Sequence, residues 1–186
     1  PSGKLTMTFP KNVGQIPIYY AAKNTGRPLQ EGRWFEKFRS NYLDVDNQPL
    51  YPFGYGLSYT TFEYGPVTLN AKEIEAGETV KAEVVVRNTG KVAGREVLML
   101  YLSYPDSNHV REVRSLAAFA KSSLLEPGES EIVTMEFDIT CFASFDKHNS
   151  CFILEKGEYI IAINGNPECI VVLDEDCITE IVKPMF

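Results

Sequence analysis

The chain has 186 residues, a length between one domain and two, and its 44% hydrophobic content is enough for a sizeable core. Its formal net charge of -7 and its pI near 4.9 argue against nucleic acid and anionic membranes as partners, because their phosphate groups would be repelled. No apolar run approaches the roughly 18 residues that a membrane-spanning helix needs.

The first twenty residues contain two extended runs, residues 4–9 and 15–20, which we expect to be strands. Pro10 follows the first run and Pro17 interrupts the second, so these strands should lie at a sheet edge. Neither has a hairpin partner nearby. We expect them to complete a sheet whose other members lie upstream, in a longer protein. The start has no signal-peptide character, which leaves the compartment open with a cytoplasmic location favoured over secretion.

Residues 21–50 are rich in turn-forming residues and include four aromatic side chains: Trp34, Phe35, Phe38 and Tyr42. A long irregular stretch in a compact protein is usually functional or wraps another surface. We expect it to lie on a partner domain, because exposed aromatic rings are costly. The alternative, that the rings attach this stretch to the chain's own core, stays open.

Residues 52–60 read PFGYGLSYT and are interpreted as a packed connector. Gly54 and Gly56 allow backbone conformations closed to other residues, while the neighbouring rings can be buried. A flexible linker would contain Gly and Ser without large apolar side chains. We therefore expect a folded body on each side of the connector, and we expect the connector to be partly exposed in this chain or covered by a neighbouring copy.

From residue 67 onward, short strands alternate with turns. Val80, Ala82, Val84 and Val86 alternate with polar residues, which indicates a half-buried antiparallel strand. The seven predicted strands are residues 67–74, 80–88, 95–103, 115–121, 131–139, 157–164 and 169–173. This pattern predicts a mainly β fold, an immunoglobulin-like antiparallel sandwich. Because no Cys-Trp-Cys signature accompanies it, a fibronectin type III-like domain fits best.

The strand at residues 97–102 is apolar on both faces, whereas the outer face of a sandwich should be polar. Leu98, Leu100 and Leu102 fill one face and leave Val97, Met99 and Tyr101 on the other. We favour an outer face that docks another domain. Coverage by the chain's own loop at 104–113, or a homodimer contact through this face, are the alternatives.

The four cysteines, Cys141, Cys151, Cys169 and Cys177, all lie in the last third of the chain. None forms a C-x-x-C pair, and only His109 and His148 could join them, so the spacing argues against a zinc site. Free thiols in strands are the favoured interpretation. The pairs Cys141–Cys151 and Cys169–Cys177 stay open as disulfides.

The sequence shows no catalytic, cofactor-binding or metal-binding residues. Acidic residues fall in turns or on outward strand positions, such as Glu83 and Glu136, where we expect solvent. Asp44 and Asp46 lack the ligand number of a calcium loop. No nucleophile elbow, phosphate-binding loop or dinucleotide fingerprint is present.

Several stretches carry a resemblance to a known family. They are PSGKL at residues 1–5, PLYPFGYGLSYTTF at 49–62, NTG at 88–90, GREV at 94–97, LEPGES at 125–130 and GEY at 157–159. Together they resemble the C-terminal region of glycoside hydrolase family 3 β-glucosidases and β-xylosidases. The resemblance implies that residues 1–59 are the end of an α/β sandwich domain with its connector, and that residues 60–186 are a fibronectin type III-like domain.

The resemblance also implies a parent enzyme that hydrolyses β-glucosides with retention. Its catalytic carboxylates lie upstream of the matched region, so this chain alone is expected to be inactive and to brace the catalytic domains. Its expected partners are those upstream domains and, through the parent, a β-linked glucoside or oligosaccharide. A carbohydrate- or protein-binding module is the alternative. Whether Trp34, Arg39 or Tyr42 border the parent's active site stays open.

Overall fold

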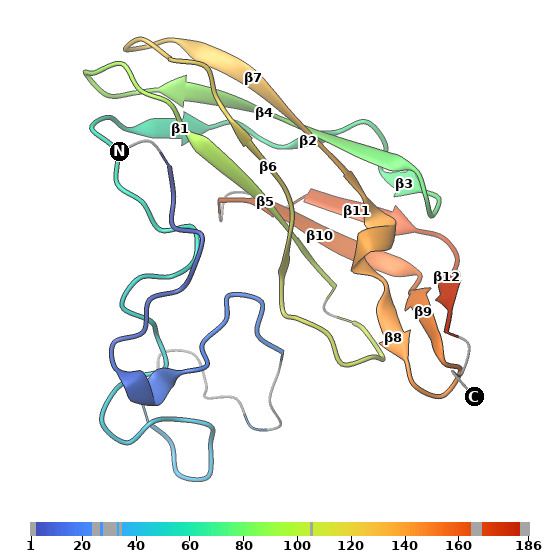
Figure 1. Ribbon diagram of the computed structural model, residues 1–186. Helices are drawn as coiled ribbons and strands as arrows, with labels where there is room; N and C mark the ends of the chain where they lie inside the picture. Colours follow the sequence, from blue (N-terminus) through green and yellow to red (C-terminus); the bar gives the residue numbers. More distant parts are fainter. Residues whose placement is uncertain are drawn as a thin grey trace.

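The computed structural model describes residues 3–23, 27, 33, 35–104, 106–164 and 169–182 (Figure 1). Within these residues the regular secondary structure is almost entirely strand. The elements are η1 (Val13–Gln15), β1 (Phe62–Tyr64), β2 (Thr68–Leu69), β3 (Glu73–Ile74), β4 (Thr79–Asn88), β5 (Val97–Ser103), β6 (Ser115–Lys121), β7 (Ser130–Asp138), η2 (Ile139–Phe142), β8 (Ser144–Asp146), β9 (Cys151–Leu154), β10 (Gly157–Ile163), β11 (Cys169–Leu173) and β12 (Cys177–Ile181). No described helix is long and apolar enough to cross a membrane.

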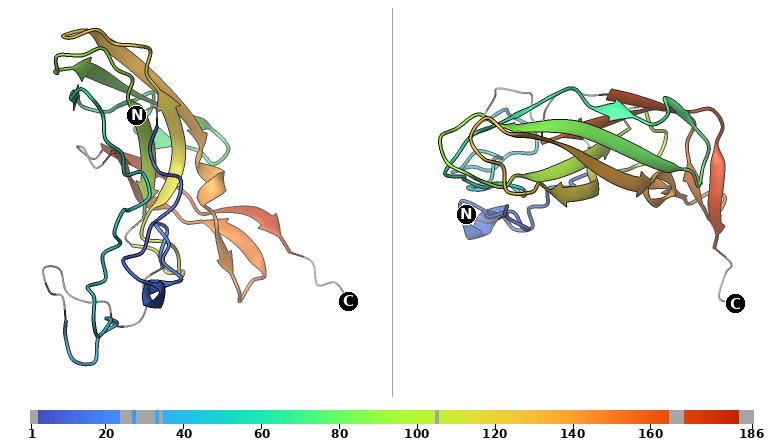
Figure 2. Two further views of the ribbon diagram at one scale, coloured as in Figure 1. Left: turned by 60° about the vertical axis from the view of Figure 1, so that its left-hand side comes forward. Right: turned by 90° about the horizontal axis from the view of Figure 1, so that it is seen from above.

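Two larger sheets form the sandwich (Figures 1 and 2). In the first, β4 pairs antiparallel with β1, β2 and β7. In the second, the strand order is β3-β11-β10-β5-β6, and the β3–β11 pair is parallel. A third sheet, ordered β12-β9-β8, projects from one end of the sandwich, as Figure 2 shows. The predicted mainly β, fibronectin type III-like sandwich is confirmed.

The core lies between the two larger sheets and follows from side-chain alternation. Residues of β4 are exposed and buried in strict turn, because successive side chains on a strand point to opposite faces. The largest fully buried side chain is Tyr159, in β10. Burial of aliphatic and aromatic side chains of this kind contributes about 1.5–3 kcal/mol each. Apolar packing therefore holds the sandwich together.

Most of the predicted strands are present, with two kinds of correction. Residues 67–74 form two short strands, β2 and β3, in different sheets rather than one strand. The four strands β1, β8, β9 and β12 were not among the seven predicted. All four have five residues or fewer, and such short runs show too little alternation to be recognised.

The prediction of strands at residues 4–9 and 15–20 is wrong. Residues 4–9 run beside the connector and bond to it at scattered points: Leu5 N–H donates to Tyr55 O and Phe9 N–H to Tyr51 O, each at 2.8 Å. Residues 13–15 form η1 instead, and the buried Gln15 amide donates to the carbonyls of Asp46 and Gln48. Prolines in this region remove the backbone donors that a regular ladder needs.

Candidate functional site

The outer face of β5 is covered by the N-terminal part of the same chain. The ring of Tyr20 stacks on Phe53, with centroids 4.1 Å apart, and meets Tyr101 of β5 edge-on at 6.3 Å. Met99 and Tyr101 are consequently only 7% and 8% exposed. We call this contact the docking seam: Tyr20, Phe53 and Gly54 on one side, and Met99, Tyr101 and Arg114 on the other.

Gly54 lets the connector approach β5 closely. Its backbone has φ = 80°, a conformation that favours glycine. A Cβ atom at this position would lie 3.0 Å from Met99 Sδ and 3.2 Å from Tyr101 Oη. The glycine of the connector is thus required by both its backbone angle and its neighbours.

Arg114 closes the docking seam from the side of the sandwich. Its guanidinium carbon lies 5.0 Å from the centroid of the Tyr101 ring, within range of a cation–π interaction. Burial raises the pKa of Tyr101, although the charge of Arg114 acts in the opposite direction. Burial therefore favours the neutral Tyr101 hydroxyl, while its ring packs between Tyr20 and Arg114.

A polar cluster continues the contact next to the docking seam. The Lys4 ammonium forms an ion pair with Glu96, which is only 8% exposed. Tyr64 Oη donates to the same Glu96 oxygen at 2.7 Å, and Asn164 Nδ2 donates to Tyr64 Oη at 3.0 Å. Burial, together with the hydrogen bond to Glu96, raises the pKa of Tyr64 far above its ordinary value.

Asn88, at the end of β4, holds the connector where the sandwich begins. Its Oδ1 accepts hydrogen bonds from Thr60 Oγ1 at 2.6 Å and from the Gly90 amide at 3.0 Å. Its Nδ2 donates to the carbonyls of Val92 and Leu125. One buried side chain therefore joins the connector to two loops, and all its polar atoms are satisfied.

Both faces of β5 are buried, which confirms that its outer face is covered. The cover comes from residues of the N-terminal segment, whereas the loop at 104–113 was the alternative. Because this cover leaves Met99 and Tyr101 buried, the structure does not support the other alternative, a homodimer contact through that face. The connector itself is partly exposed as expected, with Leu57 at 70% and Tyr59 at 82%.

The aromatic residues of 21–50 differ in their surroundings. Tyr42 is half-buried and its hydroxyl donates to the carbonyl of Gln15 at 3.1 Å, so it attaches the loop to the chain itself. Phe35 and Phe38 are exposed. Arg39 lies 3.6 Å from Glu36 in a partly exposed ion pair. Trp34 lies outside the described residues.

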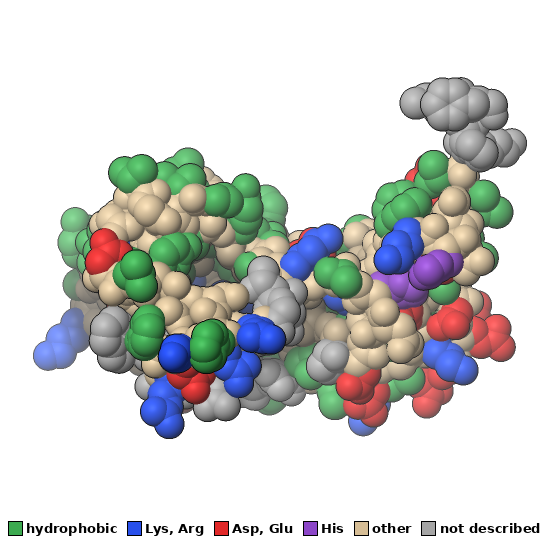
Figure 3. Space-filling view, turned by 90° about the horizontal axis from the view of Figure 1, so that it is seen from below, with side chains coloured by type: hydrophobic (Ala, Val, Ile, Leu, Met, Phe, Trp, Pro, Cys, Tyr) green, Lys and Arg blue, Asp and Glu red, His purple; other side chains and the backbone are tan. Residues whose placement is uncertain are grey.

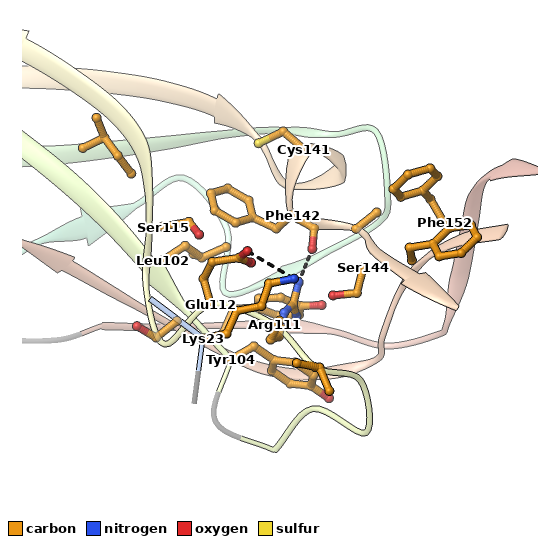
Figure 4. Close-up of a pocket in the computed structure, with 16 residues that line it drawn as sticks. Lys23, Leu102, Tyr104, Arg111, Glu112, Ser115, Cys141, Phe142, Ser144 and Phe152 are labelled. Carbon is orange, nitrogen blue, oxygen red and sulfur yellow. Dashed lines mark hydrogen bonds and ion pairs between the residues drawn. The ribbon is translucent and has the colours of Figure 1, made fainter. Parts of the chain in front are cut away.

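A cavity of about 390 Å³ lies at the end of β5, beside η2 and β8 (Figure 4). The Arg111 guanidinium donates to the carbonyl of Phe142 and packs over the ring of Tyr104 at 5.4 Å. Close by, the buried Glu155 carboxylate accepts from the Asn108 amide at 2.8 Å and from Ser107 Oγ. These contacts fix the loop after β5 onto the sandwich, a use of polar groups that sequence reasoning missed.

The remaining chemistry-bearing residues are dispersed. The acidic residues at turns and outward strand positions, such as Glu83 and Glu136, are exposed as expected. Asp46 pairs with Lys11 at 2.7 Å, and this hydrogen bond lowers the pKa of Asp46. In the described part of the chain, no three His, Cys, Asp or Glu side chains are grouped to hold a metal ion.

All four cysteines are free thiols, in line with the favoured interpretation. Cys151, Cys169 and Cys177 lie in strands, whereas Cys141 lies exposed in η2. Burial raises the pKa of Cys169, which disfavours its reactive thiolate at neutral pH.

Comparison with known proteins places these features in a family. Residues 96–166 match the model of the fibronectin type III-like domain. The periplasmic β-glucosidase of Salmonella typhimurium is 47% identical over 139 residues, which are 75% of this chain and 18% of that protein. Thermostable β-glucosidase B of Acetivibrio thermocellus is 34% identical over 98% of this chain and 24% of its own length.

A solved structure agrees with these sequences. The β-glucosidase from Listeria innocua in complex with gluconolactone is 36% identical, with a TM-score of 0.82, over 94% of this chain and 24% of that one. The chain thus spans only about a fifth to a quarter of the proteins it matches. We conclude that the chain contains a fibronectin type III-like domain and is similar to a C-terminal portion of glycoside hydrolase family 3 β-glucosidases.

Proposed function

We propose that the chain is the accessory C-terminal portion of a β-glucosidase, where it braces the catalytic domains. The observation that carries this proposal is the docking seam, in which Tyr20 and Phe53 are held against Tyr101 of the sandwich. A seam of stacked rings and a buried ion pair resists relative motion of the two parts. Whatever is attached to the N-terminal segment is therefore held in a fixed position relative to the sandwich.

The proposed division places the end of an α/β sandwich domain and its connector at residues 1–59, and the fibronectin type III-like domain at 60–186. In support, the described strands begin at Phe62. The N-terminal segment also exposes many large apolar side chains on its surface (Figure 3); they include Met7, Val13, Ile16, Tyr19, Leu43, Leu57 and Tyr59. Apolar surface of this extent marks an interaction site, which in our proposal is covered by the catalytic domains.

The catalytic carboxylates come from those domains in this proposal, and the substrate is a β-linked glucoside. The names of the relatives, which are β-glucosidases in Salmonella, Acetivibrio and Listeria, support this substrate class. Hydrolysis with retention requires two carboxyl groups about 5 Å apart in a cleft. The solvent-exposed acidic residues of this chain suit a surface, and the buried Glu96 and Glu155 are occupied by hydrogen bonds.

The test uses the longer polypeptide that carries this chain after the domains present in its relatives. We expect that polypeptide to hydrolyse 4-nitrophenyl β-D-glucoside, and we expect the 186-residue chain alone to be inactive. Deleting residues 60–186 should lower the Tm of the catalytic domains together with their activity. An inactive full-length protein would refute the proposed β-glucosidase activity. A deletion without effect on Tm and activity would refute the bracing role.

A binding module is the less favoured alternative, because the relatives match this chain as part of a hydrolase. Isothermal titration of the 186-residue chain with cello-oligosaccharides distinguishes the two functions. The bracing role predicts no saturable heat.

A further inference from the structure

The ion pair between Lys4 and Glu96 differs from the others that the structure describes. Their side chains are 18% and 10% exposed, whereas in every other described pair at least one side chain is more than a third exposed. The two residues lie 92 positions apart, one in the N-terminal segment and one directly before β5. The least exposed ion pair therefore joins the two parts of the proposed division.

The sandwich supplies Glu96 with neutral hydrogen bonds but, within the described residues, with no other ion-pair partner. Tyr64 of β1 donates to its carboxylate at 2.7 Å, and Asn164, which follows β10, approaches the same oxygen at 3.4 Å. A buried carboxylate that loses its cation costs several kcal/mol. The charge on the sandwich side is thus balanced only when the N-terminal segment is docked.

Asn164 links this charge to the backbone of β5. Its Oδ1 accepts from the Met99 amide at 2.9 Å, and its Nδ2 donates to the Val97 carbonyl at 3.1 Å as well as to Tyr64. The backbone of Asn164 has φ = 50°, a conformation in which Asn is enriched. The ion pair and the strand that carries the docking seam are therefore parts of one hydrogen-bonded cluster.

We propose that Lys4 and Glu96 form a charge latch that selects the docked position of the N-terminal segment. This inference rests on the proposed bracing function, since it names the residues that hold the two parts in place. The docking seam supplies attraction mainly through contacts between rings. The latch adds the position, because Glu96 is compensated only when Lys4 reaches it.

A single and a double substitution in the 186-residue chain test the latch. The measurement is hydrogen exchange of the Leu5 and Gly54 amides. These amides bond across the segment, Leu5 N–H to Tyr55 O and Gly54 N–H to Leu5 O, each at 2.8 Å. We expect Lys4→Met to speed their exchange at least tenfold. Adding Glu96→Gln should restore exchange to within about threefold of the wild type, because removing both charges leaves nothing unpaired.

The matched control is Lys11→Met, which removes the exposed Lys11–Asp46 pair at 2.7 Å and should leave the exchange of both amides unchanged. Unchanged exchange in Lys4→Met, or a double variant as fast as the single one, would overturn the latch. Because the measurement does not involve catalysis, its failure leaves the glucosidase assay unaffected. If the parent enzyme is inactive but exchange is fast in Lys4→Met and restored in the double variant, the proposed function is refuted and the latch is supported.

Discussion

Tyr159 shows at the scale of one residue how the sandwich buries a polar atom safely. Its side chain is fully buried, its ring stacks on Tyr104 with centroids 4.5 Å apart, and its hydroxyl donates to the carbonyl of Glu155 at 2.7 Å. Burial raises the pKa of Tyr159 to about 12, even though the nearby Arg111 acts to lower it. The neutral hydroxyl is the form that the core accepts.

This raised pKa predicts a loss of stability in alkaline solution. Between about pH 10 and pH 12 the unfolded chain has released the Tyr159 proton and the folded chain has kept it. The folded state then binds more protons, so its free energy of unfolding falls with rising pH, by up to about 1.4 kcal/mol per pH unit for this group. Below this window the contribution of Tyr159 is constant. Urea unfolding followed by circular dichroism at a series of pH values measures the slope.

Tyr159→Phe serves as the comparison for that measurement. The variant loses the hydrogen bond to Glu155 and so should be less stable at neutral pH, by about 1 kcal/mol. Between about pH 10 and pH 12, its free energy of unfolding should nevertheless fall less steeply than that of the wild type. The difference in slope corresponds to the one proton that Tyr159 binds. Equal slopes for the two proteins would contradict the assignment, because other tyrosines such as Tyr64 are common to both.

At the scale of elements, the start of β1 and the loop after β4 fit together through glycine. A Cβ atom on Gly90 would lie 2.1 Å from Thr60 Oγ1 and 2.8 Å from the backbone nitrogen of Thr61. The Thr61 nitrogen belongs to the backbone, so a change of side-chain rotamer cannot relieve this contact. The loop between β4 and β5 therefore tolerates no side chain at this position without moving the end of the connector.

We predict that Gly90→Ala lowers the free energy of unfolding by about 1–3 kcal/mol or more. This is the usual cost of adding atoms to a well-packed site. The clash should also weaken the hydrogen bond between Thr60 and Asn88. Gly3→Ala is the control, because a Cβ there meets nothing within 4 Å. Chemical denaturation gives both free energies of unfolding, and equal values for the two variants would show that the loop can shift freely.

Sequence reasoning succeeded for elements with a strong local signal. The alternation from Val80 to Val86 predicted β4, and the two apolar faces of residues 97–102 predicted a covered outer face on β5. It failed where partners decide the structure: residues 4–9 look like a strand, yet they bond to the connector only at scattered points. Which segment covers β5, and which carboxylates are buried, depends on contacts between distant residues such as Lys4 and Glu96.

At the scale of the whole molecule, the N-terminal segment behaves as the outer layer of the second sheet. Tyr20 and Phe53 lie over β5 where solvent would otherwise meet Met99 and Tyr101. The segment has one side on the sandwich and exposes apolar side chains elsewhere. In the proposed enzyme it is therefore a middle layer between the sandwich and the catalytic domains.

A chain that begins at residue 60 should accordingly be less stable and should expose the apolar outer face of β5 to solvent. Uncovering Met99 and Tyr101 removes apolar burial that is worth about 1.5–3 kcal/mol for each side chain. We expect a lower free energy of unfolding and new binding of the dye ANS. Replacing both residues by threonine in the truncated chain should abolish the dye binding. A truncated chain as stable as the complete one, without dye binding, would contradict the role of the segment.

The separation between Lys4 and Glu96 has a consequence for biosynthesis. The chain is made from its N-terminus, and the 92 positions between the two residues correspond to roughly 5–18 s of translation at the usual rates. During that time the rings of the N-terminal segment have no β5 on which to settle. The rings that pack on β5 therefore leave the ribosome before that strand has been made, so the docking seam can form only after the sandwich has begun to be synthesised.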